Sequence, residues 1–127
     1  MNCGVIVFKR LNEIINVDLN EVIKICESKV TDQGLSMYDM YHELNKVINC
    51  QAIASLKLIN NTPFIAFIGF DSKGHYVLVE KIDRYVHIYD PAGKYKKCTK
   101  LFFYMLWSKK GIVLCYNPIF DSSKKAK

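Results

Sequence analysis

Three residues in this sequence have side chains that could together activate a thiol for nucleophilic attack. Cys3 stands at the start of a predicted helix, where the helix dipole and unpaired backbone N–H groups favour the thiolate. Gly4 beside it leaves room for a substrate backbone to approach. His75 opens a predicted strand, and Asp90 closes the next one. Because an imidazole held by a carboxylate can take the proton of a thiol, these residue types predict acyl-transfer chemistry.

The three side chains can act together only if the two strands form a hairpin. A tight turn at 83–84 would bring the outer ends of the strands together, so that His75 and Asp90 meet at one end of the sheet. Each residue also has an ordinary interpretation, because cysteine is often buried and histidine and aspartate are common in turns. The combination, in the chain order Cys, His, Asp, favours the chemical interpretation.

The elements that must position these residues follow from the apolar periodicity. Four helices are predicted, at 4–16, from Asp18 onward, from Ser36 to about 48, and at 99–107. The second begins with a capping box of Asp18 and Glu21, and the third with a capping box of Ser36 and Asp39. The predicted strands are 63–70, 76–82, 85–89 and 112–116. Since helices come first and strands later, we expect an α+β fold with N-terminal helices packed on an antiparallel sheet.

Composition narrows the function classes further. The chain has 127 residues and a net charge of +6, which suits one domain over 1–120 followed by a basic flexible tail at 121–127. Its five cysteines form no C-x-x-C pair, and its three histidines form no cluster, so we expect no metal site. The glycines of 69–74 lack the Lys and Ser/Thr of a phosphate loop. We also expect no signal peptide and no membrane span.

Six short motifs in the expected order resemble a known family. They are Asn2-Cys3-Gly4-Val5, Gly34-Leu35-Ser36, Pro63-Phe64-Ile65-Ala66, Gly74-His75-Tyr76-Val77-Leu78, Ile88-Tyr89-Asp90-Pro91-Ala92-Gly93 and Phe103-x-x-x-Trp107. The chain is similar to the bacteriocin-processing cysteine peptidase domain of peptide-exporting ABC transporters. The resemblance spans residue 2 to about residue 116 and implies a papain-like cysteine peptidase fold.

The resemblance also implies a role for each of the three site residues. Cys3 would be the nucleophile, His75 the general base and Asp90 the residue that orients the histidine. The implied reaction cuts export-bound peptides after a double-glycine leader, without a cofactor. The implied partners are that leader peptide and the transmembrane and ATPase parts of an ABC transporter, and the implied location is cytoplasmic, at the inner face of the cell membrane.

Two features depart from the family's pattern and leave alternatives open. Asn2 stands where relatives usually have Asp. Relatives also place a Gln a few residues before the nucleophile, for the oxyanion hole, and neither Met1 nor Asn2 can supply it. The alternatives are a catalytically weak or inactive domain that binds export substrates, and a different papain-like acyl-transfer enzyme. We expect no nucleic-acid partner, because the lysines are scattered and no recognition motif accompanies them.

The missing glutamine generates a first testable prediction. We expect the 127-residue chain to bind a leader peptide but to cut it slowly, because losing one oxyanion donor costs about 100–1,000-fold in rate. An N-terminal extension that supplies a Gln a few residues before Cys3 should raise the single-turnover rate by more than about tenfold, with little change in peptide affinity. Fast cleavage by the 127-residue chain would show that another group supplies the donor.

Overall fold

The computed structural model describes residues 2–32, 34–57, 60–69 and 75–115, which form helices packed on one antiparallel sheet. The helices are α1 (Cys3–Ile14), α2 (Asn20–Ser28), α3 (Met37–Leu44) and α4 (Lys100–Leu106). The strands are β1 (Cys50–Ala54), β2 (Phe64–Ile68), β3 (His75–Ile82), β4 (Tyr85–Tyr89), β5 (Lys97–Thr99) and β6 (Trp107–Leu114). No helix in these ranges has the length and apolar content of a membrane span.

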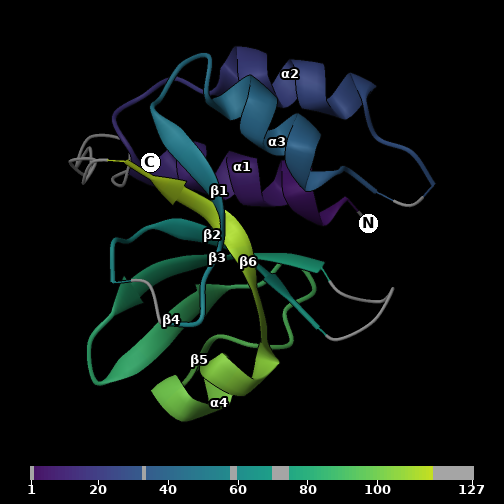
Figure 1. The fold of residues 1–127 in the computed structure, drawn as a ribbon. Coiled ribbons are helices and arrows are strands. Elements are labelled where there is room, and N and C mark those ends of the chain that lie inside the picture. Colours follow the sequence, from purple (N-terminus) through teal and green to yellow (C-terminus); the bar gives the residue numbers. More distant parts are fainter. Residues whose placement is uncertain (1, 33, 58–59, 70–74, 116–127) are drawn as a thin grey trace.

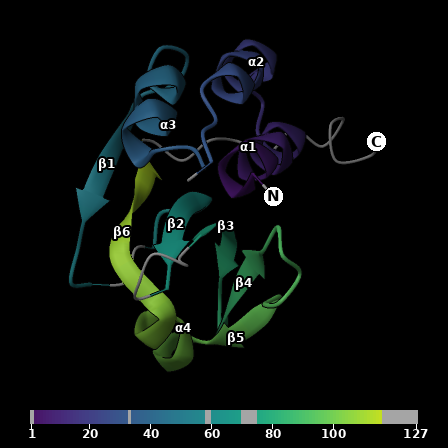
Figure 2. The same ribbon diagram turned by 90° about the vertical axis from the view of Figure 1, so that its right-hand side faces the viewer.

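The helices divide between the two sides of the sheet. The strand order is β1-β6-β2-β3-β4-β5, with every neighbouring pair antiparallel. Helices α1, α2 and α3 lie together on one side, and α4 lies at the opposite end of the molecule (Figures 1 and 2). The expected α+β fold is therefore confirmed. The tail at 121–127 and most of the 69–74 glycine segment fall outside the described residues.

The apolar strands are buried on both faces, which explains why their sequences are nearly continuous hydrophobic runs. Ile65 and Leu78 belong to a core cluster that includes α1, α2 and α3. Phe64 and Val77 belong to a second cluster on the other face, which Phe103 of α4 completes. A sheet covered on both sides does not show the apolar–polar alternation of a half-exposed one.

The helix boundaries confirm one sequence-based cap and correct another. Ser36 caps α3 as expected, because its side chain accepts a hydrogen bond from the Asp39 N–H. The predicted capping box of Asp18 and Glu21 is wrong, since Leu19 is the N-cap of α2 and makes no side-chain cap bond. The Asp18 carboxylate instead accepts from the Asn20 N–H at 2.9 Å. Helix α3 ends at Leu44, four residues before the predicted end at 48.

Two strands were not predicted, and a third is longer than predicted. β1 buries fully only its first residue, Cys50, and β5 is three residues long, so neither carries a clear hydrophobic pattern. β6 begins at Trp107 instead of 112, directly after α4. Ile68 of β2 pairs with Trp107 on one side and with His75 on the other.

The close contact of β6 with β2 generates a stability prediction. A Cβ added at Gly111 would collide with the Ile65 carbonyl oxygen, which belongs to the backbone and cannot move aside. We expect Gly111→Ala to lower the free energy of unfolding by about 3 kcal/mol in urea denaturation. Gly34→Ala is the matched control, because no atom lies within 4 Å of its added Cβ and only its φ of +94° opposes the change. Equal losses for the two variants would contradict the steric explanation.

Candidate active site

A histidine–aspartate pair forms where the beginning of β3 meets the end of β4. The two strands pair antiparallel around the 83–84 turn, as the sequence predicted. The His75 Nε2 lies 2.9 Å from the Asp90 Oδ1. The Asp90 side chain is 0% exposed and the His75 side chain 23% exposed, so the imidazole lies between a buried carboxylate and solvent. Residues fifteen positions apart are therefore brought into direct contact.

The Asp90 carboxylate is held by the backbone of the segment that follows it. Its Oδ1 accepts from the Ala92 N–H at 2.9 Å, and its Oδ2 accepts from the N–H groups of Lys94 and Tyr95, both at 3.1 Å. Gly93 supplies the turn with a φ of +73°, and its N–H donates to the Asp90 carbonyl at 2.8 Å. Sequence reasoning missed these donors, although the Pro-Ala-Gly turn after Asp90 was the available signal.

The pairing fixes which imidazole nitrogen is free to act as a base. An ionised carboxylate only accepts hydrogen bonds, so Nε2 of His75 must carry the proton that it shares with Asp90. In the neutral ring, Nδ1 then has the lone pair. The histidine can therefore take a proton through Nδ1 while Asp90 holds its orientation and stabilises the resulting positive charge.

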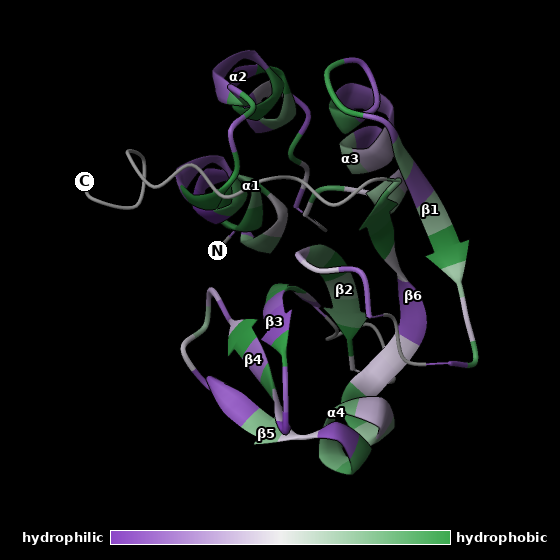
Figure 3. Cartoon of the chain, turned by 90° about the vertical axis from the view of Figure 1, so that its left-hand side faces the viewer, coloured by the Kyte–Doolittle hydropathy of each residue, from purple (hydrophilic) through white to green (hydrophobic). Residues whose placement is uncertain are grey.

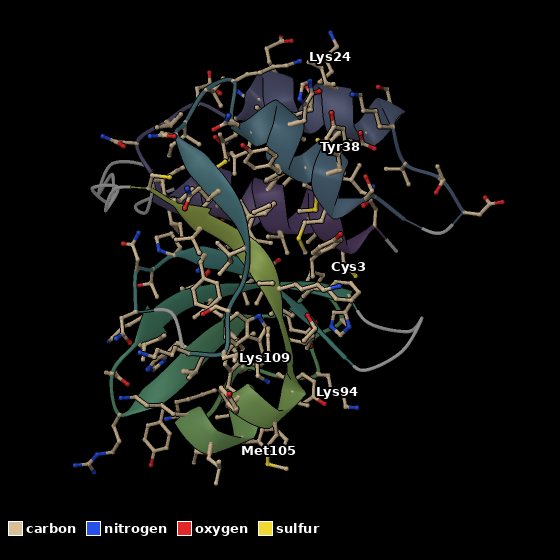
Figure 4. The ribbon with its side chains drawn as sticks, viewed as in Figure 1. Cys3, Lys24, Tyr38, Lys94, Met105 and Lys109 are labelled. Atoms are coloured by element: carbon tan, nitrogen blue, oxygen red, sulfur yellow. The ribbon has the colours of Figure 1, made fainter. Side chains whose placement is uncertain are left out.

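Cys3 is the first residue of α1 (Figure 4). The Asn2 side chain caps α1 by accepting a hydrogen bond from the Val5 N–H at 3.3 Å. Its amide oxygen therefore caps the helix as the carboxylate of an aspartate at that position could. The Tyr76 backbone hydrogen-bonds the Cys3 sulfur, and Asp90 is close enough for its charge to act on the thiol. The Cys3 thiol thus lies near Asp90 and the start of β3, the strand that begins at His75.

The electrostatics of Cys3 differ from the sequence-based expectation. Burial raises the pKa of the Cys3 thiol, and the negative charge of Asp90 raises it further. Backbone hydrogen bonds from Tyr76 and from Cys3 itself act in the opposite direction but do not outweigh these causes. The expected thiolate stabilisation at the helix start is therefore wrong for the substrate-free domain, in which the thiol is the favoured form.

Gly4 also has a different role from the one expected. A Cβ at this position would lie 3.0 Å from the Met40 Sδ and 3.1 Å from the Leu35 Cδ2. The missing side chain therefore lets α1 approach α3 and Leu35, which precedes the cap residue of that helix. Gly4 positions the helix that carries Cys3, and its open face is turned to the core instead of to a substrate.

The remaining cysteines differ in their surroundings. Burial raises the pKa of Cys26 to about 11 and that of Cys50 to about 12, so both thiols are neutral at neutral pH. Cys115 is exposed and follows the end of β6, so its predicted place inside a strand is wrong. Within the described ranges, no group of three or more His, Cys, Asp or Glu could hold a metal ion.

Comparison with known proteins identifies the family of this chain. The model of the Peptidase C39 family matches residues 1–120. The chain belongs to the Peptidase C39 family. No curated protein matches this C39 chain at a significant level.

Solved structures show that the fold of this C39 chain is shared. The peptidase domain of Streptococcus ComA, described as a bi-functional ABC transporter involved in quorum sensing, has a TM-score of 0.65 and 20% identity, over 89% of this chain and 90% of that one. The peptidase domain of Streptococcus mutans ComA has a TM-score of 0.62 and 23% identity, over 90% and 91%. The arrangement of helices on an antiparallel sheet is thus shared with these peptidase domains.

The raised pKa of Cys3 predicts how this C39 domain reacts with an alkylating agent. Because a raised pKa lowers the thiolate fraction at neutral pH, we expect the iodoacetamide reaction of Cys3 to reach half its maximal rate above pH 8.5, about the pKa of free cysteine. Peptide mapping by mass spectrometry across neutral to alkaline pH measures this rate at Cys3 alone. A plateau that is already complete below neutral pH would instead indicate a preformed thiolate–imidazolium pair.

Proposed function

We propose that this domain is a cysteine endopeptidase that cuts export-bound peptides after a double-glycine leader. The observation that carries the proposal is the His75–Asp90 pair at 2.9 Å, with Cys3 beside it at the start of α1. A thiol, an imidazole with a free Nδ1 and a buried carboxylate are the three groups that nucleophilic acyl transfer by a cysteine requires. Membership of the Peptidase C39 family supports the same reaction.

The proposed reaction uses each of these groups in turn. Nδ1 of His75 takes the Cys3 proton as the sulfur attacks the carbonyl carbon of the second glycine. The backbone N–H of Cys3, at the first position of α1, belongs to the same residue as the attacking sulfur and can stabilise the negative oxygen that forms. The intermediate collapses to a thioester as the imidazolium gives its proton to the leaving amine, and water then releases the leader.

The substrate and partner are proposed from family resemblance. The similarity to the peptidase domains of ComA, an ABC transporter, supports a leader-bearing export peptide as substrate. It also supports a transporter as the partner, which would place the domain on the cytoplasmic side of the membrane. Glycine at both positions before the cut leaves no side chain to clash in a narrow cleft.

A second candidate function is binding without efficient cleavage. The raised pKa of the Cys3 thiol favours it, because a neutral thiol beside a negative carboxylate is a weak nucleophile. A group that stabilises the thiolate, such as a further hydrogen-bond donor, would be needed for turnover.

Cleavage of a synthetic leader peptide ending in Gly-Gly separates these functions. We expect single-turnover cleavage after the second glycine, and a loss of at least about 100-fold in Cys3→Ala and His75→Ala. Leader affinity, measured by fluorescence anisotropy, should remain. A peptide with Leu-Leu in place of Gly-Gly should bind but stay intact.

Matched controls come from the chain itself. His87 also contacts a carboxylate, with its Nε2 3.0 Å from the Asp83 Oδ1, but in the β3–β4 turn. His87→Ala and Cys115→Ala should cleave at the unaltered rate. Binding without any cleavage would favour the second function, and equal cutting of the Leu-Leu peptide would contradict double-glycine specificity.

A further inference from the structure

Charge is distributed unevenly along the chain. Residues 1–90 contain nine Lys and Arg against eleven Asp and Glu, whereas residues 91–115 contain six Lys and no acidic residue. The second segment supplies the turn after Asp90, β5, α4 and β6. Five of its lysines are exposed: Lys94, Lys96, Lys97, Lys100 and Lys110. The net positive charge of the described chain is therefore carried by residues 91–115, the segment that includes α4.

Helix α4 exposes large apolar side chains at the same end. Its sequence, KLFFYML, is apolar on every side, yet only Phe103 is fully buried. Leu101 is 71% exposed, Met105 60% and Phe102 45%. Figure 3 shows α4 at the end of the molecule away from α1, α2 and α3, and Figure 4 shows Met105 well separated from Cys3. We call Leu101, Phe102 and Met105 the α4 surface.

The α4 surface is held rigidly in spite of its exposure. Thr99 caps the helix by accepting from the Phe102 N–H at 3.1 Å. Lys109 donates to the carbonyls of Tyr104 and Trp107 at the other end, so this sixth lysine is bound to the helix. The Tyr104 hydroxyl donates to the Leu56 carbonyl at 2.7 Å, which ties α4 to the segment after β1. The apolar side chains therefore project from a fixed helix.

We infer that the α4 surface is a membrane-contact site that inserts into the interface of an anionic lipid bilayer. Large apolar side chains exposed on one short helix, in a segment that carries six lysines and no acidic residue, are the pattern of an interfacial helix. The exposed lysines would contact lipid phosphates while Leu101, Phe102 and Met105 enter the acyl boundary. Side chains that are as exposed as Leu101 and Met105 project outward, which suits a flat bilayer better than the groove that a peptide helix requires. This inference does not depend on the proposed peptidase function.

Cosedimentation with lipid vesicles tests the α4 surface. The full chain should bind vesicles of phosphatidylcholine mixed with phosphatidylglycerol, bind pure phosphatidylcholine much more weakly, and dissociate as salt is raised. The double variant Leu101→Ser/Met105→Ser should bind the mixed vesicles at least about tenfold more weakly. Lys96→Gln/Lys100→Gln should lose about tenfold or more. Because these side chains are exposed, the thermal unfolding midpoint of both variants should stay unchanged.

The opposite end of the molecule provides the control. Tyr38 is 70% exposed and lies on α3, and Lys24 is exposed on α2 (Figure 4). Tyr38→Ser/Lys24→Gln should bind the mixed vesicles like the unaltered chain. Unaltered vesicle binding by Leu101→Ser/Met105→Ser would overturn the inference, as would an unaltered chain that ignores anionic vesicles.

The same variants distinguish two other molecules that could cover the α4 surface, the leader peptide and a second copy of the chain. If Leu101→Ser/Met105→Ser weakened leader-peptide affinity without vesicles, the α4 surface would belong to the peptide site and the inference would be wrong. If the unaltered chain formed a dimer that this variant abolished, a second copy would be the occupant and the inference would again be wrong.

Discussion

The architecture of the site depends on one constraint, which is that a buried carboxylate must have its hydrogen-bonding capacity filled. Asp90 meets it with three backbone N–H groups from the following turn and one imidazole nitrogen. The turn can close around the carboxylate because Gly93 takes a positive φ. An unpaired charge at this depth would cost several kcal/mol. The same bonds that satisfy Asp90 therefore determine where β4 ends, how the chain leaves it and how His75 is oriented.

The sequence predicted those parts of the fold in which local pattern and tertiary role agree. The hairpin that joins His75 to Asp90 could be predicted because β3 and β4 have strong apolar patterns and a polar turn between them. β1 and β5 could not, because they are stabilised by pairing at the sheet edges and bury few side chains. The role of Gly4 was equally hidden, since its neighbours Leu35 and Met40 are distant in sequence.

The state of Cys3 shows why residue types alone do not determine reactivity. A helix start favours a thiolate, and sequence reasoning could identify that effect. Burial and the charge of Asp90 favour the neutral thiol, and both depend on how the chain folds around the sulfur. The Asp90 carboxylate thus has two opposite effects, because it supports a positive imidazole and opposes a negative sulfur. In the substrate-free domain the folded surroundings of the sulfur therefore favour the neutral thiol over the thiolate.

The direct passage from α4 into β6 has a mechanical consequence. Trp107 both ends the helix and begins the strand, and Gly69 donates to the Leu106 carbonyl at 2.9 Å. Ile68 pairs with Trp107 through one edge of β2 and with His75 through the other. Only β2 therefore lies between the C-terminal end of α4 and His75. A force on α4, whatever molecule exerts it, is transmitted through the backbone hydrogen bonds between β6, β2 and β3, and the last of these strands positions His75.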